Sequence, residues 1–433
     1  MSSAQQKDLF PVTELRPLPS PGEVKIVPVG GTGWAKSSVN AAIFRTNSVI
    51  THGDTQYVGF YDGDGNVVLG KRRIGTTQWE TRKTQYKGNV KDAHNAISLG
   101  IDGRGVLHMS WDMHGHTLHY ARTSAPGSLE LGDEIPMTGQ KENRVTYPQF
   151  YALPDGDLLF TYRDGGSGNG NSMLNRYDVQ TDRWEAVAHP VVAGGGQRNA
   201  YLNTFGIDSK GGVHLSWVWR ETGDVATNHD ICYAYSPDQG KNWQKSTGEK
   251  YTLPITIENA EVVWEVPQKS ELINSTSMTV DANDRPVIAT YWRDQNSEVP
   301  QYRVVWHDGQ RWQSSVAGNR TLGFRLSGGG TKRIPISRPQ VVAGAGNRIY
   351  VIFRDEERNS GISVAVSQDV ARKEWRVVDL LKESVGSWEP SYDPEMWKRA
   401  GTLHLFVQRV GQGDAETLED LPPQEVSILE WSP

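Results

Sequence analysis

The sequence predicts an all-β protein, and specifically a seven-bladed β-propeller. Convincing amphipathic helices are scarce, a strand–turn–strand unit recurs seven times, and one stretch matches the Asp-box turn of propellers. Each unit has a short strand, a turn rich in Asp and Gly, and a second strand that ends in an aromatic–polar pair. Self-similarity at a fixed period is typical of repeat architectures.

The seven units fall at regular intervals along the chain. Their ranges are 51–65, 99–115, 152–166, 206–221, 279–294, 342–357 and 396–410. One polar landmark per unit recurs every 50 to 73 residues: Asp62, Asp112, Arg163, Arg220, Arg293, Arg354 and Arg409. About fifty residues suffice for a four-stranded blade.

The Asp-box stretch is Ser236-Pro-Asp238-Gln-Gly240-Lys-Asn-Trp243. Its Asp can bind turn amides while its Trp packs between strands. A Trp also closes an outer hairpin in most units: Trp79, Trp184, Trp243, Trp312, Trp375 and Trp431. The alternative architecture is an open pair of β-sandwiches.

A propeller ring must close, because an open blade leaves strand edges exposed. Residues 425–432 read as a strand, and a strand from the first fifty residues is expected to complete the same blade. We divide the chain into an N-terminal extension over 1–35 and one propeller domain, the catalytic one, over 36–433.

Composition narrows the function. The net charge of −6 argues against a nucleic-acid binder, although a local Arg cluster can still attract an anionic polymer. No stretch is long and apolar enough to span a membrane. The start, MSSAQQKDLF, has no signal-peptide pattern. We expect a monomer.

Candidate site residues follow from the propeller geometry. The innermost strand of each blade lines a central funnel, so residues before each Asp–Gly turn should face it. His94 precedes Asp102 by eight positions and Tyr147 precedes Asp155 by eight, which gives two titratable groups on neighbouring blades. His114 and His116 in WDMHGHTLHY, and Arg163 in FTYRDGG, are expected at the same rim.

This set suits β-elimination at a uronic acid. An Arg fork can stabilise the enolate-like charge on the carboxylate as the C5 proton leaves. A neutral His or an activated Tyr can act as base, and Tyr or His can protonate the leaving oxygen. Other readings stay open: His94 as a structural hydrogen-bonder, His114 and His116 as metal ligands, and Arg163 as an ordinary repeat feature.

Three runs carry a family resemblance: DAHNAISLGIDGRGVLHMSWDMHGHTLHY (92–120), RVTYPQF (144–150) and LLFTYRDGGSGNG (158–170). They resemble the BNR-repeat propellers that include ulvan lyases, polysaccharide lyase families 24 and 25, and family 25 most closely. The resemblance extends from about residue 40 to the end, and it implies that the protein acts outside the cytoplasm, secreted or periplasmic. It implies a seven-bladed, endo-acting lyase that cleaves the rhamnose-3-sulfate–uronic acid linkage of ulvan, a sulfated anionic polysaccharide.

The resemblance also implies residue roles. His94 would be the base, Tyr147 the acid, Arg163 the neutraliser of the carboxylate, and His114 an assistant in binding. Base and acid exchange between glucuronate and iduronate remains open. Further substrate contacts are expected at funnel or rim positions: Asn95, His116, Asn203, Tyr291, Arg293, Arg338 and Arg354.

No cofactor is expected in catalysis, but the relatives bind a structural metal, zinc or calcium. His214, His229 and Cys232 lie on two strands that should pair, and their mixed N and S character would favour zinc. A buried Cys with two hydrogen-bonded His is the equal alternative.

Three rival functions remain. Arg333-Ile-Pro335 spells a sialidase motif, but it lies in the sixth repeat and not at the start of the domain. A glycosidase or lyase acting on rhamnose–glucuronate is closer, yet an ordinary glycosidase needs paired carboxylates, and Asp112 and Asp164 occupy turn-like positions. A carbohydrate-binding propeller without activity is the third.

Overall fold

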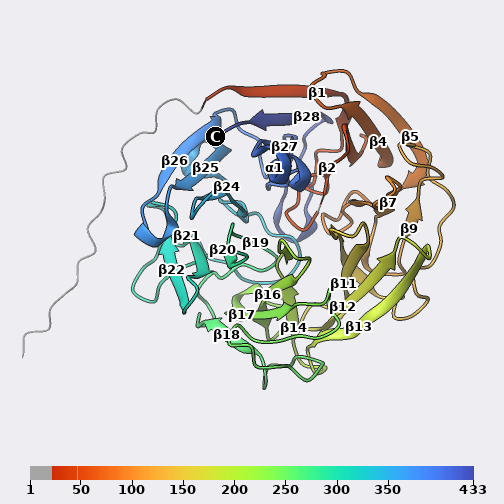
Figure 1. The fold of residues 1–433 in the computed structure, drawn as a ribbon. Coiled ribbons are helices and arrows are strands. Elements are labelled where there is room, and N and C mark those ends of the chain that lie inside the picture. The colour runs from red at the N-terminus through yellow and green to blue at the C-terminus, as the bar shows by residue number, and fades with distance from the viewer. Residues whose placement is uncertain (1–21, 46) are drawn as a thin grey trace, which may run out of the picture.

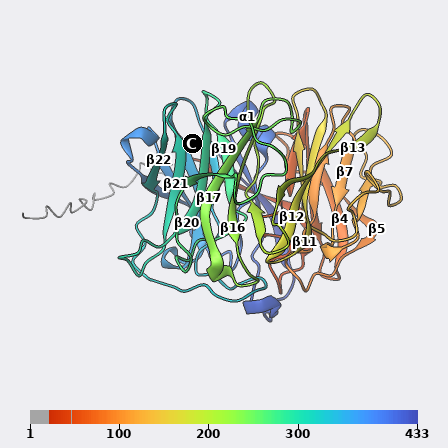
Figure 2. The same ribbon diagram turned by 90° about the horizontal axis from the view of Figure 1, so that it is seen from below.

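The computed structural model describes residues 22–45 and 47–433 and forms a ring of seven antiparallel sheets. Figure 1 shows the chain running once round the ring, with its start and end in the same blade. Figure 2, turned by 90° from that view, shows the blades side by side, with their strands running along the height of the ring. The predicted seven-bladed β-propeller is therefore confirmed.

The strands follow chain order within each blade. Blades one and two contain β2 (Val49–His52), β3 (Thr55–Tyr61), β4 (Asn66–Arg73), β5 (Glu80–Lys87), then β6 (Ser98–Ile101), β7 (Leu107–Ser110) and β9 (Tyr120–Arg122). Blade three contains β10 (Val145–Ala152), β11 (Leu158–Gly166), β12 (Asn169–Asp178) and β13 (Arg183–Ala193), and β8 (His114–His116) pairs with the start of β10. Blade four contains β14 (Asn199–Leu202), β15 (Gly206–Ile207), β16 (Val213–Arg220), β17 (Asn228–Ser236) and β18 (Glu261–Trp264).

The remaining blades complete the ring. Blades five and six contain β19 (Ser277–Val280), β20 (Pro286–Trp292), β21 (Gln301–His307), β22 (Trp312–Val316), then β23 (Gln340–Ala343), β24 (Ile349–Asp355), β25 (Gly361–Ser367) and β26 (Arg376–Leu381). Blade seven contains β27 (Leu403–Val407), β28 (Gln424–Trp431) and β1 (Val24–Gly33). Helical segments are α1 (Pro394–Ala400), η1 (Val225–Thr227), η2 (Glu356–Arg358), η3 (Val370–Arg372) and η4 (Asp414–Glu416). Within the described ranges, no helix has the length and apolar character that a bilayer crossing requires.

Blade seven is closed by the first strand of the chain. β1 pairs antiparallel with β28, from Val24 opposite Trp431 to Pro28 opposite Ser427, and it lies outside β28 in Figure 1. The expectation that an early strand completes the last blade is confirmed. The boundary at residue 35 is corrected, because residues 24–33 belong to the propeller; residues 1–21 lie outside the described part.

Asp side chains explain why the repeat is visible in the sequence. Asp102 accepts hydrogen bonds from the amides of Arg104 and Val106, and Asp208 accepts them from Lys210 and Gly212. The same bonds recur in blades one and five through Asp62 and Asp281. Asp102, Asp208 and Asp281 thus fix the turn after the innermost strand of their blades, whereas Asp62 fixes the turn between β3 and β4.

The Asp box forms as predicted. Asp238 accepts from the amide of Asn242 at 2.7 Å, and the indole of the buried Trp243 donates to the carbonyl of Gly240. Gly240 has a φ of +96° and a Cβ there would lie 2.4 Å from Leu174, so only glycine fits this turn.

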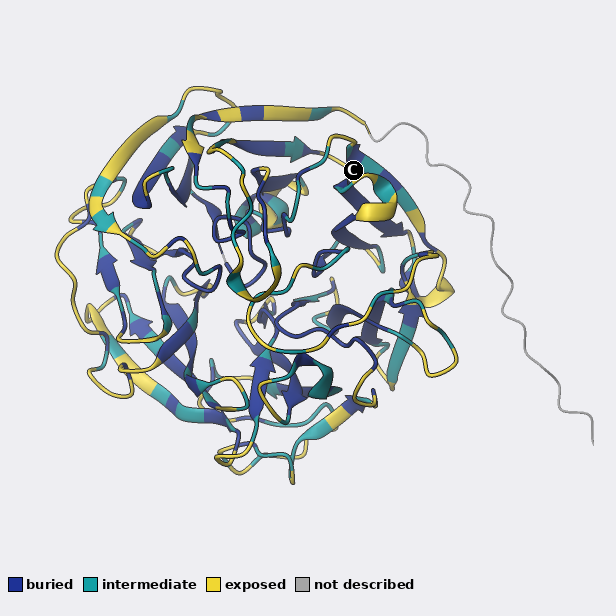
Figure 3. Ribbon diagram, turned by 180° about the vertical axis from the view of Figure 1, so that it is seen from behind, coloured by how far each residue is buried: buried dark blue, intermediate teal, exposed yellow. Residues whose placement is uncertain are grey.

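The core lies between neighbouring blades. Figure 3 shows that inner and middle strands are buried, whereas outer strands carry the exposed residues. Because side chains alternate between the two faces of a strand, both faces of a middle strand such as β24 pack against adjoining sheets. All seven of its residues are buried, and it reads as a continuous apolar run ending in Arg354 and Asp355.

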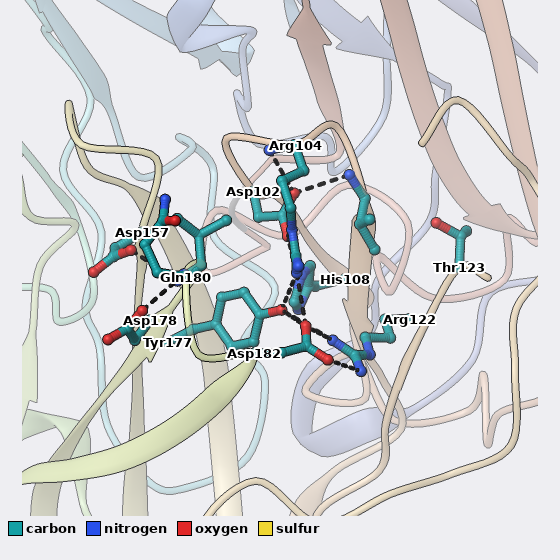
Figure 4. Close-up of polar contacts among 12 residues, drawn as sticks. Asp102, Arg104, His108, Arg122, Thr123, Asp157, Tyr177, Asp178, Gln180 and Asp182 are labelled. Carbon is teal, nitrogen blue, oxygen red and sulfur yellow. Dashed lines mark hydrogen bonds and ion pairs between the residues drawn. The ribbon is translucent and has the colours of Figure 1, made fainter. Parts of the chain in front are cut away.

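At the turn end of the ring, an ion-pair network joins blades two and three (Figure 4). The Asp182 carboxylate accepts from Arg104 at 2.7 Å, from both terminal nitrogens of Arg122 at 2.6 and 2.7 Å, and from the Tyr177 hydroxyl. Hydrogen bonds from Arg122 hold the pKa of Asp182 well below its usual range, with Arg104 and Tyr177 adding to the effect. The network therefore clamps two blades by charge rather than by apolar burial.

Asp182→Asn is expected to lower the free energy of unfolding by about 1 kcal/mol, because it removes a partly exposed carboxylate shared by two cations. The loss should shrink in high salt, where screening weakens the network in the native protein as well. Urea unfolding at low and high salt measures both effects. Asp133 and Asp182 both line a surface cavity beside this network, so Asp133→Asn is the control. Equal destabilisation by the two variants would contradict the clamp.

Candidate functional site

An open cavity lies at the end of the funnel opposite the Asp turns, with an empty volume of about 800 Å³. Two kinds of position supply its lining. Segments just before the innermost strands provide Phe44, His94 and Arg338, and the innermost strand β10 provides Tyr147. The ends of the second strands provide Arg163, Arg220 and Arg354. The polar residue that ends the second strand therefore reaches the cavity in three of the seven repeats, those of Arg163, Arg220 and Arg354.

His94 and His114 share one carboxylate. Asp92 accepts from Nδ1 of His94 at 2.7 Å with one oxygen and from Nδ1 of His114 at 2.6 Å with the other. An ionised carboxylate only accepts hydrogen bonds, so both Nδ1 atoms carry protons and each Nε2 keeps a lone pair when the ring is neutral. Burial opposes ionisation of Asp92, but the hydrogen bonds from His114 and His94 hold its pKa well below the usual range.

The two imidazole rings stack with centroids 3.9 Å apart and an interplanar angle of 15°. Within the described ranges, Asp92, His94 and His114 are the one set of three or more such side chains whose ligand atoms could meet at a metal ion. An ion held by an imidazole nitrogen lies in the plane of that ring, and two stacked rings share no plane. The geometry therefore fits a bridging carboxylate and not a metal ion.

The environment separates the two histidines electrostatically. Burial lowers the pKa of His94, but Asp92 and the nearby Glu416 outweigh it and raise the pKa above the ordinary value. Burial lowers the pKa of His114, and the neighbouring His94 adds to that effect. His94 also stacks on Phe44, with ring centroids 5.5 Å apart.

Tyr147 reaches the cavity through a β-bulge. Its φ is +58°, and the register of β10 against β11 shifts between Thr146 and Gln149. Such a bulge turns a side chain out of the regular alternation. The Tyr147 ring lies 5.7 Å from that of His94, and burial raises the pKa of its hydroxyl well above 10, so the group stays protonated and able to donate.

Arg163 lies directly against Tyr147. Its guanidinium carbon is 5.0 Å from the centre of the Tyr147 ring, and Nη2 donates to the Thr146 hydroxyl at 3.0 Å. Gly170 faces it across the hairpin, where a Cβ would lie 2.9 Å from Cδ of Arg163. The Gly-rich segment after Arg163 therefore gives this long side chain its space.

Two of the arginines predicted to contact substrate line the cavity, and their N–H groups already donate hydrogen bonds within the protein. Arg338 forms a two-pronged ion pair with Glu389 at 2.8 and 2.7 Å and lies over Phe44. Arg354 donates to three backbone carbonyls, those of Trp388, Pro335 and Ile334. Both bring positive charge to the cavity.

Five predicted substrate contacts do not line the cavity. Asn95 and Asn203 are buried and bond neighbouring strands and loops, Asn95 to the carbonyl of Asn89 and Asn203 to Ser216 and Thr276. Tyr291 points into the inter-blade core, and Arg293 pairs with Glu271 at 2.6 Å. His116 is exposed on β8 outside the cavity. Asn95, Asn203 and Arg293 lie just outside the strands, where hydrogen bonds and an ion pair hold them away from the cavity.

The predicted metal ligands His214, His229 and Cys232 do not form one donor set. His214 pairs with Tyr235 and Cys232 with Trp217, three positions further along β16, so their side chains lie on opposite faces of the sheet. His214 bonds the Tyr233 hydroxyl at 2.8 Å, and His229 contacts Glu221 and Asp230. Cys232 is buried among apolar residues.

Sequence reasoning missed Tyr201 and left Arg220 unassigned. The Tyr201 hydroxyl lies 2.9 Å from Ser167 Oγ and 3.4 Å from Arg163 Nη1, and Arg220 lies 5.1 Å over its ring. Burial opposes its ionisation, but Arg220 and Arg163 lower its pKa below 10. A signal existed, because Tyr201 precedes the Asp208 turn by seven positions, one short of the count that found His94.

Curated relatives match much of the chain. It is 24% identical over 342 residues to "Ulvan lyase, short isoform" of Alteromonas sp. (strain LOR), covering 60% of this chain and 64% of that protein. It is 26% identical over 276 residues to the long isoform of Alteromonas sp., covering 48% and 27%. It is 21% identical over 306 residues to an ulvan lyase of Nonlabens ulvanivorans, covering 62% of each. The chain thus spans less than two thirds of each relative's length.

Solved structures share the fold. An ulvan lyase of polysaccharide lyase family 25, bound to a GlcA(1-4)Rha3S saccharide, superposes with a TM-score of 0.72 at 14% identity, over 93% of this chain and 95% of that one. A second polysaccharide lyase superposes with a TM-score of 0.67 at 16% identity, over 95% and 99%. At such identities the likeness establishes the propeller.

Membership follows from the sequence model of the repeat. The model described as "BNR repeat-containing family member" matches residues 55–320, more than half of the chain and the part that holds His94, Tyr147 and Arg163. The chain belongs to the BNR repeat-containing family.

Proposed function

We propose that this protein is an endo-acting polysaccharide lyase that cleaves the rhamnose-3-sulfate–uronic acid linkage of ulvan by β-elimination. The observation that carries the proposal is the convergence of His94, Tyr147 and Arg163 on one open cavity. The names of the curated relatives support the substrate, since they are ulvan lyases. The solved family-25 lyase that superposes on the chain supports the fold for this chemistry.

Each residue takes one step of the reaction. The Arg163 guanidinium binds the uronate carboxylate and stabilises the charge that builds there. Nε2 of His94 removes the C5 proton, the electrons of the C5–H bond form the C4=C5 double bond, and the C4–O4 bond breaks. Tyr147 donates its hydroxyl proton to the departing oxygen. Proton return from His94 to Tyr147 through solvent restores the starting state.

The charge of the cavity suits an anionic polymer. Arg163, Arg220, Arg338 and Arg354 all line it, and Glu389 is the single acidic residue of the described lining. His114 supports the base through the carboxylate it shares with His94. We place the enzyme outside the cytoplasm, where a polymeric substrate is available, and as a monomer, because one chain supplies the whole cavity.

A glycosidase on rhamnose–glucuronate is the weaker alternative. Ordinary glycosidases need two carboxyl groups at the scissile bond. Glu389 is tied to Arg338 by two hydrogen bonds, and both oxygens of Asp92 are taken by His94 and His114. The described cavity therefore offers no free pair of carboxyl groups.

Tyr147→Phe is expected to lower turnover of ulvan by about 10²–10⁴-fold, because it removes the proton donor for the leaving oxygen. The measurement is ultraviolet absorbance of ulvan with wild type and variant, since the C4=C5 product absorbs and a hydrolysis product does not. An early fall in viscosity reports endo action.

The control is Tyr151→Phe, because Tyr151 lies on the same strand but bonds Gln149 away from the cavity. New reducing ends without ultraviolet absorbance would show that the protein is a hydrolase and not a lyase. Polymer binding by wild type without any cleavage would instead indicate a carbohydrate-binding propeller without activity.

A further inference from the structure

The loop between β27 and β28 holds Glu416 in an unusual conformation. Ala415 has φ and ψ of 51° and 50°, and Glu416 has a φ of 65°. Two consecutive residues other than glycine in the left-handed region are strained, and such strain persists only where surrounding contacts impose it. The contacts of Glu416 include His94, the proposed base.

The Glu416 carboxylate bridges three segments. Oε1 lies 3.2 Å from Nδ1 of His94 and accepts from the amide of Thr331 at 2.7 Å, while Oε2 accepts from the amide of Ala93 at 3.2 Å. The side chain is 24% exposed. Glu416 therefore binds the backbone beside His94 as well as its ring.

We propose that Glu416 is a positioning residue for His94: with Asp92 it holds the Nδ1 proton and fixes the ring so that Nε2 faces the cavity as the base. This inference rests on the proposed lyase function. The His94 ring is held by stacking against Phe44 and His114 and by two carboxylates at Nδ1. A carboxylate behind a histidine fixes its tautomer and orientation and raises its basicity.

The direction of the electrostatic effect follows from the groups that face His94. Asp92 and Glu416 favour the imidazolium, whereas burial and the stacked His114 oppose it; Tyr147 beside it stays neutral. The net result is a raised pKa. Since the base must be neutral to accept a proton, activity rises with pH through this pKa, and removing one carboxylate moves that rise to lower pH.

Glu416 also connects the base to a segment that lies over the cavity. Gly328 bonds η1 of blade four, where its carbonyl accepts from the amide of Val225 at 2.9 Å. A few residues on, the Thr331 carbonyl accepts from the amide of Ala415 at 2.8 Å in blade seven. Residues 328–331 thus cross from one blade to the other along the cavity wall, and Glu416 ties this crossing to His94.

The test compares Glu416→Gln with wild type. Glutamine keeps the volume and can still accept from Thr331, but it loses the charge. In protein with ¹⁵N-labelled histidine, the NMR titration of the His94 ring, identified with His94→Gln, should move down by about one pH unit. The acid limb of kcat/KM on ulvan should move by the same amount, with kcat lowered and KM near wild type.

Two variants make the result specific. Asp414→Asn removes a carboxylate of the same loop that pairs with Lys332 and does not touch His94, so both titrations should stay at wild type. Glu416→Asp keeps the charge but withdraws it by one methylene, and it should titrate between wild type and Glu416→Gln. It also serves if the glutamine variant does not fold.

The two readouts separate this inference from the proposed function. A shifted His94 titration supports the positioning role even where no variant, nor wild type, cleaves ulvan. An unshifted His94 titration in folded Glu416→Gln and Glu416→Asp overturns it even if the wild type is an active lyase. Reduced activity with an unmoved acid limb also overturns it, since that is the signature of a merely structural residue.

Discussion

Replacing His94 with alanine is expected to lower kcat on ulvan by about 10²–10⁴-fold while polymer binding stays near wild type. The reason is that His94 supplies the Nε2 lone pair that takes the C5 proton, whereas the arginines of the cavity attract the polymer. Ultraviolet absorbance of the product measures turnover, and a binding assay with intact ulvan measures affinity.

His116→Ala is the matched control for this experiment. His116 lies two residues from His114 on β8 but is exposed and outside the cavity, so its loss should leave kcat within a few-fold of wild type. Equal turnover by His94→Ala and wild type would remove His94 from the reaction. Equal losses in both variants would instead indicate a general disturbance of this rim.

Arg163→Ala should reduce kcat/KM by about 10²–10³-fold, because it removes the guanidinium that binds the uronate carboxylate and stabilises its charge as the C5 proton leaves. Arg163→Lys should recover only part of the loss, since an ammonium cannot reproduce the planar fork that binds both oxygens of a carboxylate. The position of the acid limb should follow His94 and hence change little in either variant. Steady-state kinetics on ulvan over a range of pH tests all three statements.

Arg409→Ala provides the comparison for Arg163. Arg409 holds the equivalent place in the last repeat, but it is exposed and does not line the cavity. A large loss in Arg409→Ala would mean that the arginines of the repeat act through the fold. Full activity in Arg163→Ala would show that Arg163 is an ordinary feature of the repeat with no role in the reaction.

Local chemistry made the fold readable from the sequence. Asp102, Asp208 and Asp281 each fix the same turn by bonding two amides, so the same letters recur in several blades. Counting eight positions back from the turn leads to a residue in the innermost strand or just before it. That count brought His94 and Tyr147 to one cavity.

The remaining site residues depend on long-range geometry. Glu416 is 322 positions from His94 in the chain, and no local pattern marks their contact. Tyr291 packs into the core between blades, and Asn203, which lies between β14 and β15, is buried and bonded to Ser216 and Thr276. The opposite faces of His214 and Cys232 likewise depend on the register of β16 against β17, which residue types alone do not set.

The pairing of β1 with β28 has a consequence for biosynthesis. The ribosome makes β1 before the six blades that follow it and β28 after them, so β1 and β27 lack their shared partner until β28 emerges. Glu416 belongs to that late-made blade, only eight residues before β28. A nascent chain that has completed six blades already contains His94, but it gains the Glu416 carboxylate only when the seventh blade closes the ring. The closure of blade seven is therefore the step that also brings Glu416 to His94 and completes the surroundings of the base.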